Sequence, residues 1–505
     1  MNSPYQLTVF DFFHRNALMN GTGCALYYNG ESRSHSQVFD DACRLTNGMA
    51  KLNLAAGTRV AIAAKNHPAF FHLFAAASAL NLCLVLMNRR LGEDELAHVL
   101  DDTTPQVVIY DNDMEGKIEP LIQGRSGITH SYNLAGNFST LYAPDTQGAV
   151  ERASDSDPNL AYIIIHTAAV QGKPRGALLS QGNLILANLQ LMHAYELNKT
   201  KAYLNILPLF HIMGVNIGLG TLMAGGKNVI MDQFSPKACL DLIQEQNVSI
   251  FGSFPPILGR ILECIRSQDT PPDLACLEIA TGLESVETAK LWETTTGSKF
   301  WIMYGQTETS GLITFSPILD QPGSAGLVSP LARMIIADDL DNALPPGSIG
   351  EILVKGPLVF KGYWNADDLN AFTFRNGWHH TGDMGQMDEK GYLYFRGRKP
   401  EKELIKPGGE NVFPAEVENA LASHVAIEQA CVFGVPDEEF GEAIKAVCTL
   451  STGYNIEEKE LIAYTGTLIA GFKKPKFIVF ADQLPLTSSG DIDRFAVKEK
   501  YSNGH

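Results

Sequence analysis

The sequence predicts an α/β protein with a large N-terminal domain of layered α/β sheets, a small β subdomain and a small α+β C-terminal domain. Short apolar runs, typical of buried strands, alternate with helical patterns up to about Pro330. Beyond Pro330 hairpin signals dominate, and a charged, proline-containing segment follows Arg398. The length of 505 residues also exceeds the ~250–300 residues over which one core grows.

Continuous apolar runs mark the strands of the first part. Such runs are typical of strands covered on both faces in a largely parallel sheet. Residues 69–86 are expected to form a buried helix behind the first strand. The strands are expected at residues 59–64, 107–110, 162–165, 202–207, 228–231, 248–252 and 300–303.

Hairpin turns organise the β subdomain. Pro345-Pro-Gly347 and Asn376-Gly377 are turn signals near candidate strands at 351–355 and 392–396.

The charged segment at 399–403, Lys-Pro-Glu-Lys-Glu, is the best domain boundary. It predicts an N-terminal domain over 1–398, a hinge over 399–403 and a C-terminal domain over 404–505. This last domain is expected to contain a helix at 414–423 and strands at 429–435 and 444–450.

Composition excludes several classes of protein. A hydrophobic content of 45% and a charged content of 19% are ordinary for a globular protein. The formal charge of −17 argues against nucleic acid and anionic membrane surfaces as partners. It does not exclude ATP, which backbone N–H groups and Mg²⁺ can bind locally.

The sequence contains no clear targeting signal and no clear metal-binding motif. The eight cysteines form no CxxC motif or Cys/His cluster, so buried reduced thiols are expected. The N-terminus lacks a signal-peptide pattern, and no apolar run reaches the ~18 residues of a membrane span. We therefore expect a cytoplasmic protein without a transmembrane segment; the sequence gives no sign of its oligomeric state.

Four short motifs in a fixed order carry the functional signal. They are Tyr304-Gly-Gln-Thr-Glu308, Thr381-Gly-Asp383, Gly397-Arg398 and Leu404-Ile-Lys-Pro-Gly-Gly409. Together they resemble the adenylate-forming superfamily, and within it the acyl-CoA synthetases (AMP-dependent synthetases and ligases), over about residues 25–494. This resemblance implies ATP-dependent activation of a fatty or aromatic acid through an acyl-adenylate, transfer to CoA, and release of AMP and diphosphate.

The first motif follows a predicted strand and ends in a hydroxyl and a carboxylate. Thr307 can donate to the α-phosphate, and Glu308 offers a hard oxygen ligand for Mg²⁺. Asp383 can accept the ribose hydroxyls, and Arg398 can reach ribose and phosphate as a fixed cation. Taken singly, the first motif is better explained as a strand-end turn with a helix-capping Thr, and the alternative for the Asp is a place in a hairpin turn. The predicted nucleotide site comprises Thr167, Gly282, Leu283, Glu284, Tyr304, Gly305, Gln306, Thr307, Asp383 and Arg398, where the resemblance places residues 282–284 along the adenine.

A further match, Pro208-Leu-Phe-His-Ile-Met-Gly214, would place His211 between the acid and the nucleotide. A lone His beside Phe210 is otherwise a common core residue. The proposed acyl-pocket walls are His211, Val215, Gly218, Phe254 and Pro255. The proposed CoA-binding residues are Lys406, Gly408 and Gly409.

The resemblance also implies a mobile C-terminal domain that rotates between adenylation and thioester formation. The pivot of that rotation corresponds here to Lys402 and Glu403, in a linker longer than is usual for the family. Hinges need a few residues that absorb backbone change, which a longer linker still provides.

Two family patterns are altered. The phosphate loop reads Thr167-Ala-Ala-Val-Gln-Gly-Lys-Pro-Arg-Gly176 and keeps a hydroxyl only at Thr167, which predicts weaker ATP binding. Asp491 stands where the family has its adenylation lysine, and a carboxylate there repels developing negative charge. Losing such a contact commonly costs ~10²–10³ in rate.

Three readings therefore stay open. The first is a complete ATP-dependent acyl-CoA synthetase. The second is an enzyme specialised for the thioester half-reaction or its reverse. The third is a non-catalytic homologue that binds nucleotide or acyl-CoA.

Overall fold

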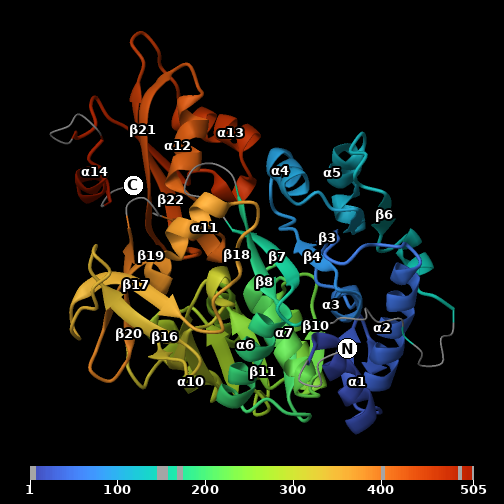
Figure 1. Cartoon of the computed structure of the whole chain (residues 1–505). Coiled ribbons are helices and arrows are strands. Elements are labelled where there is room, and N and C mark those ends of the chain that lie inside the picture. Colours follow the sequence, from blue (N-terminus) through green and yellow to red (C-terminus); the bar gives the residue numbers. More distant parts are fainter. Residues whose placement is uncertain are drawn as a thin grey trace.

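The computed structural model describes residues 7–144, 150, 157–167, 174–399, 404–486 and 492–502. It has a large N-terminal part of two sheets with helices between and outside them, a small antiparallel sheet, and a C-terminal domain at the top of Figure 1. This confirms the predicted fold class.

The first sheet is parallel through its middle. Its edges are antiparallel, at β13/β14, β14/β15 and β1/β2. The strand order is β15 (Leu327–Val328), β14 (Thr314–Pro317), β13 (Lys299–Tyr304), β12 (Ile279–Gly282), β11 (Ile250–Ser253), β9 (Ala202–Asn205), β10 (Lys227–Ile230), β1 (Cys24–Tyr28) and β2 (Glu31–Ser34).

The second sheet is parallel from β7 to β6 and antiparallel where β8 joins β7 and β18. Its order is β18 (Gly362–Tyr363), β8 (Arg175–Ser180), β7 (Ala161–Thr167), β4 (Cys83–Leu86), β3 (Arg59–Ala63), β5 (Val107–Tyr110) and β6 (His130–Asn133).

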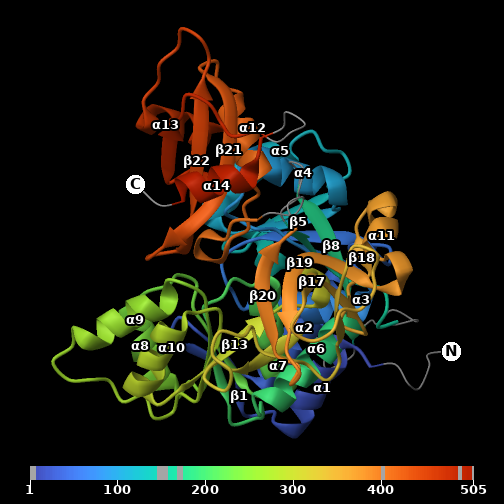
Figure 2. The ribbon, with the colours of Figure 1, turned by 90° about the vertical axis from the view of Figure 1, so that its left-hand side faces the viewer.

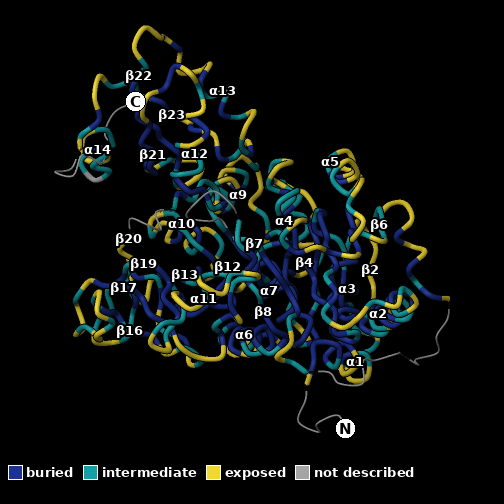
Figure 3. The backbone as a smooth tube through the Cα atoms, turned by 45° about the horizontal axis from the view of Figure 1, so that its top comes forward, coloured by how far each residue is buried: buried dark blue, intermediate teal, exposed yellow. Residues whose placement is uncertain are grey.

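Helices fill the space between these two sheets and cover their outer faces. Every residue of α7 is buried, as expected for a helix that is apolar all round. The inner helices are α1 (Val9–Met19), α2 (His35–Ala50), α3 (Ala69–Leu80), α6 (Gln181–Ala194) and α7 (Ile212–Met223). The outer helices are α8 (Pro236–Gln246), α9 (Ile257–Arg266) and α10 (Val286–Thr296) on the first sheet, and α4 (Glu93–Thr103) and α5 (Asn112–Ile122) on the second. Figure 3 shows the buried tube running through the middle of these layers.

The expected helix over residues 69–86 is wrong in its second part. α3 ends at Leu80 because Asn81 adopts a left-handed conformation with φ of 53°. The apolar run then continues as strand β4 in the middle of the second sheet. Both segments are apolar throughout because both are buried on all sides, so periodicity does not distinguish them.

The β subdomain is a four-strand antiparallel sheet among the described residues. Its order is β16 (Arg333–Ala337), β17 (Ile349–Lys355), β19 (His379–Met387) and β20 (Leu393–Arg398), with α11 (Asp367–Thr373) and the 3-10 turn η3 (Arg375–Gly377) beside it.

The C-terminal domain is built on a sheet of β21 (Ile427–Asp437), β22 (Gly441–Leu450) and β23 (Phe477–Phe480). Helices α12 (Pro414–Ala422) and α13 (Glu458–Leu468) pack on one face, and α14 (Arg494–Tyr501) packs on the other. Figure 2 shows this domain standing above the N-terminal layers. Within the described ranges, no helix is both long enough and apolar enough to cross a lipid bilayer.

Candidate active site

A cavity of about 920 Å³ lies between the N-terminal layers and the C-terminal domain. On the N-terminal side it is lined where β13, β12, β11, β9 and β7 end. Carboxyl ends of parallel strands are the usual ligand-binding edge of an α/β sheet. On the other side it is lined by the segment from Leu404 to Asn411 and by the turn at Phe440.

Glu308 is held in the cavity wall by two hydroxyl groups. It belongs to the 3-10 turn η2 (Thr307–Thr309), and its Oε1 accepts from Thr167 Oγ1 at 3.1 Å and from Tyr363 Oη at 2.9 Å. Burial and the Glu308 carboxylate raise the pKa of Tyr363, so this phenol stays a donor.

The second oxygen of Glu308 is the group that fits a metal ion. Oε2 accepts no hydrogen bond from a described residue, although Glu308 is only 8% exposed and lines the cavity. The described residues contain no cluster of three or more His, Cys, Asp or Glu side chains suited to a metal. A Mg²⁺ ion bound here would therefore take most of its oxygen ligands from phosphates and water, as is common for this ion.

Asp383 is fixed by three donors. Tyr304 Oη and Gln306 Nε2 each donate to Oδ2 at 2.7 Å, and Arg398 Nε lies 3.0 Å from Oδ1. Asp383 is 1% exposed. Since a carboxylate oxygen accepts two hydrogen bonds, Oδ1 keeps one acceptor position for a ligand hydroxyl. β19 and β20 bring Asp383 and Arg398 together, since the two residues are paired in register.

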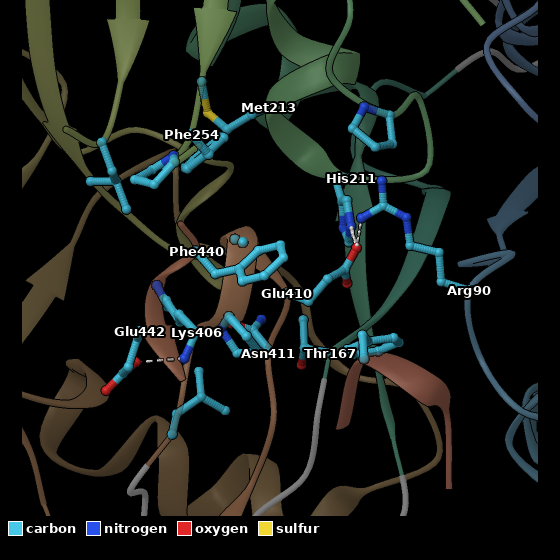
Figure 4. Close-up of a pocket in the computed structure, with 18 of the residues that line it drawn as sticks. Arg90, Thr167, His211, Met213, Phe254, Lys406, Glu410, Asn411, Phe440 and Glu442 are labelled. Atoms are coloured by element: carbon cyan, nitrogen blue, oxygen red, sulfur yellow. Dashed lines mark hydrogen bonds and ion pairs between the residues drawn. The ribbon is translucent and has the colours of Figure 1, made fainter. Parts of the chain in front are cut away.

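Glu410 connects the C-terminal domain to the N-terminal part. Its carboxylate forms an ion pair with Arg90, lies 3.4 Å from His211 Nε2, and accepts from Asn88 Nδ2 at 3.1 Å. Burial raises the pKa of Glu410, but His211 and Arg90 outweigh it and lower that pKa to about 2. Figure 4 shows Glu410 between His211 and Arg90.

The Gly408–Gly409 turn enters the cavity beside Phe254. Both glycines have positive φ, 58° and 84°, and a Cβ on Gly409 would lie 3.5 Å from the Phe254 side chain. The backbone N–H of Gly408 donates to the Phe440 carbonyl at 3.0 Å. The turn belongs to η5 (Pro407–Gly409), and its positive φ angles, rather than a lack of space, favour glycine at both positions.

The structure brings most of the predicted site residues together at the cavity. These are Thr167, His211, Phe254, Pro255, Leu283, Tyr304, Gly305, Gln306, Thr307, Glu308, Asp383, Arg398, Lys406, Gly408 and Gly409.

Four predicted site residues lie away from the cavity lining. Val215 and Gly218 are on buried turns of α7, where a Cβ at Gly218 would meet Phe71 and Asn205 of the core. Gly282 has its backbone pressed against Ser253, and Glu284 directs its carboxylate to the backbone N–H of Ser285.

The hinge residues Lys402 and Glu403, the loop residues 168–173 and Asp491 lie outside the described residues.

Sequence reasoning missed Tyr363, Glu410 and Arg90. Glu410 directly follows Gly408 and Gly409 in the sequence, and this position is only a weak signal of a functional residue. Its partner Arg90 is 320 residues away, and Tyr363 is 55 residues from Glu308. Nothing in a single sequence predicts these two pairings.

The models of two known protein families match the two parts of this chain. The model of the AMP-binding enzyme family matches residues 13–364, and that of the AMP-binding enzyme C-terminal domain matches residues 416–491. Feruloyl-CoA synthase from Amycolatopsis sp is 30% identical over 512 residues, covering 96% of this chain and 98% of the relative. Indoleacetate–CoA ligase from Aromatoleum aromaticum is 30% identical over 499 residues, covering 97% of each.

Solved structures are also similar along nearly the whole chain, and one of them bears on the ligand. It is a double mutant of o-succinylbenzoate CoA synthetase from Bacillus subtilis, bound with its product analogue OSB-NCoA. The identity is 25% and the TM-score is 0.85, with 97% of this chain and 98% of that chain covered.

Proposed function

Because this chain belongs to the AMP-binding enzyme family, with acid–CoA ligases as relatives along its whole length, we propose that it is an ATP-dependent acyl-CoA synthetase. It would activate a fatty or aromatic carboxylic acid as an acyl-adenylate and transfer the acyl group to CoA, with release of AMP and diphosphate. One observation carries this proposal: the cavity of about 920 Å³ is lined both by the Tyr304–Glu308 segment with Asp383 and by the Gly408–Gly409 turn.

The roles of the residues follow from their contacts. Asp383 and Arg398 would hold the ribose, and Thr307 would donate to the α-phosphate. Arg175 lines the cavity and is close enough to Tyr363 to oppose the rise that burial causes in the pKa of its phenol, so it would meet the phosphate chain beside the altered loop. Glu308 and the nucleotide phosphates would hold Mg²⁺, which neutralises phosphate charge when bound. Catalysis of this kind depends on position and charge.

The acyl side of the cavity favours an aromatic acid. Its wall contains Met213, Met303 and Phe254, which are polarisable and adapt to a ring. The names of the two relatives, feruloyl-CoA synthase and indoleacetate–CoA ligase, support the same class.

The side of the cavity formed by the C-terminal domain suits the phosphates of CoA. Lys474 and Lys476 line it, and Lys474 forms no ion pair with any described residue. The similar Bacillus subtilis structure contains a CoA product analogue, which supports CoA as the ligand on this side.

The altered loop at 167–176 and Asp491 favour a second candidate, an enzyme restricted to the thioester half-reaction or its reverse. Acid-dependent AMP release with ATP, Mg²⁺ and CoA separates the two. The main proposal predicts AMP and acyl-CoA in equal amounts with an aromatic acid from a mixed panel, and loss of both in Glu308→Gln. Thioester formation from supplied acyl-adenylate without AMP release from ATP would establish the second candidate instead.

A further inference from the structure

The two hydroxyl groups that hold Glu308 come from the ends of two strands in the second sheet. Thr167 is the last residue of β7, and Tyr363 is the last residue of β18. Both strand ends are tied to the same residue, Asp102, which lies in the last turn of α4. Asp102 is not among the described residues that line the cavity, so its influence on the site passes through its neighbours.

The side chain of Asp102 fixes the end of β7. His166 Nε2 lies 2.9 Å from Asp102 Oδ2, and the His166 side chain is 3% exposed. A carboxylate only accepts hydrogen bonds, so Nε2 carries the proton and donates. Successive side chains of a strand point to opposite faces, so this contact holds His166 on the face away from the cavity while Thr167, the next residue, faces Glu308.

The backbone carbonyl of Asp102 fixes the end of β18. Carbonyls in the last turn of a helix lack intrahelical partners. This one accepts from Trp364 Nε1 at 3.1 Å and from Asn365 Nδ2 at 3.0 Å. The backbone N–H of Trp364 also donates to a carbonyl of β8 at 2.7 Å. Tyr363 directly precedes Trp364, so these contacts set where its phenol meets Glu308.

A second residue on the same face of α4 contacts the strand beside β7. His98 precedes Asp102 by four residues, which places the two side chains on neighbouring turns of one helix face. His98 Nε2 lies 3.0 Å from the Pro174 carbonyl, directly before β8, and the centroid of its ring lies 6.4 Å from that of His166. One face of α4 therefore supports both strands of the β7/β8 pair.

We propose that Asp102 is a positioning residue for Glu308 and therefore for the Mg²⁺ ion that Glu308 would hold. It acts through His166 and Trp364. This inference rests on the proposed function. The two hydroxyls that Asp102 keeps in place both donate to Oε1 of Glu308, which gives the carboxylate one orientation and leaves Oε2 for the ion. A ligand group that is already oriented loses less conformational freedom on binding.

The experiment compares Asp102→Ala and Asp102→Asn with Asp101→Ala. Asp101 is the preceding residue of α4, and its side chain is 63% exposed and pairs with Arg125. Titration with ATP at a series of Mg²⁺ concentrations reports the ion without turnover. We expect the half-saturating Mg²⁺ concentration to rise about 10-fold in Asp102→Ala, which removes the acceptor, and by less than about threefold in Asp102→Asn, which keeps an acceptor oxygen. Asp101→Ala should match the unmodified protein, and equal Mg²⁺ dependence in Asp101→Ala and Asp102→Ala would overturn the proposal.

A double-mutant comparison separates positioning from a general loss of structure. With both hydroxyls removed in Thr167→Val/Tyr363→Phe, Asp102 has nothing left to position, so Asp102→Ala should raise the Mg²⁺ requirement by less than a further factor of about three. A general loss of structure adds the same factor in either background, and that result would overturn the proposal. In acid-dependent ATP–diphosphate exchange at saturating Mg²⁺, Asp102→Ala should keep kcat within about threefold of the unmodified protein.

His166→Phe is the second variant if Asp102→Ala does not fold, as judged by thermal unfolding. It keeps a ring but removes the donor to Asp102, and it should also raise the Mg²⁺ requirement about 10-fold. If the unmodified protein shows no acid-dependent exchange, the proposed function fails, while the ATP titrations still decide the role of Asp102. The proposal is overturned if ATP binding by the unmodified protein does not depend on Mg²⁺, or if His166→Phe leaves that dependence unchanged.

Discussion

At the scale of single residues, the position of Glu308 depends on the hydroxyl groups of Thr167 and Tyr363. Removing the phenol in Tyr363→Phe leaves Oε1 with one donor among the described residues. We expect the apparent KM for Mg²⁺ in adenylation to rise about 10-fold, from the loss of roughly 1.5 kcal/mol in a hydrogen bond to a charged group. Tyr454→Phe, at a residue 49% exposed, is the matched control. Unchanged Mg²⁺ dependence would contradict this role.

The pH dependence of AMP binding tests the charge of Lys406. Burial lowers the pKa of Lys406 to about 8, with Arg398, Asp383, Glu442 and Glu308 as the charged groups around it. Because only protonated Lys406 attracts a phosphate bound in the cavity that it lines, AMP affinity should fall as pH rises through about 8. Lys406→Arg keeps its charge at every accessible pH and should lose this alkaline limb. If the unmodified protein and Lys406→Arg show the same alkaline fall, a group other than Lys406 causes it.

Much of the site was predictable because its residues occur in short ordered motifs. Tyr304, Glu308, Asp383 and Arg398 line the cavity as expected. Glu410 was not predictable, since its role comes from contacts with Arg90 and His211 far away in the chain. Distant ion pairs leave no periodic or local signal in one sequence.

At the scale of elements, the end of the β subdomain is held by a buried carboxylate. Glu351 on β17 lies 3.0 Å from Lys399 Nζ and 3.3 Å from His380 Nδ1. Burial by itself raises the pKa of Glu351, but hydrogen bonds from His380, Lys399 and the Gly382 backbone lower it to about 2. Lys399, the first residue of the predicted hinge, is thereby tied to β17.

The lowered pKa of Glu351 predicts how the free energy of unfolding depends on pH. The pKa of Glu351 is depressed in the folded state, so its stabilisation is complete above about pH 4.5 and is lost as pH falls towards 2. Glu351→Gln should therefore unfold more easily at pH 7, by about 1–3 kcal/mol, and respond less to pH in this window. Thermal unfolding of both proteins between pH 2 and 7 measures this; parallel curves would show that Glu351 does not contribute.

Strand and helix positions were mostly predictable from apolar runs. The exception at 69–86 arose because α3 and β4 are both buried on all sides, and only Asn81 separates them. Asn is one of the few residues that adopt the left-handed conformation readily, which makes it a weak stop signal in retrospect.

At the scale of the whole molecule, Glu410 holds the two domains in the described arrangement. Glu410→Gln keeps the shape but removes the charge that faces Arg90 and His211. Because the Gly408–Gly409 turn lines the cavity in this arrangement, thioester formation should fall by about 10-fold or more, since breaking a buried pair is costly. Separate assays of the two half-reactions measure this. Unchanged thioester formation would contradict this role of Glu410.

We propose that this chain makes an acyl-adenylate with its own residues despite Asp491. Acid-dependent ATP–diphosphate exchange by the unmodified protein, compared with exchange by Asp491→Lys, measures this activity. We predict exchange by the unmodified protein with an aromatic acid, and less than about a threefold gain in Asp491→Lys, because Arg175 and Arg398, which line the cavity, already offset the charge. Exchange in Asp491→Lys alone would contradict the claim and show that the natural protein is specialised for the thioester step.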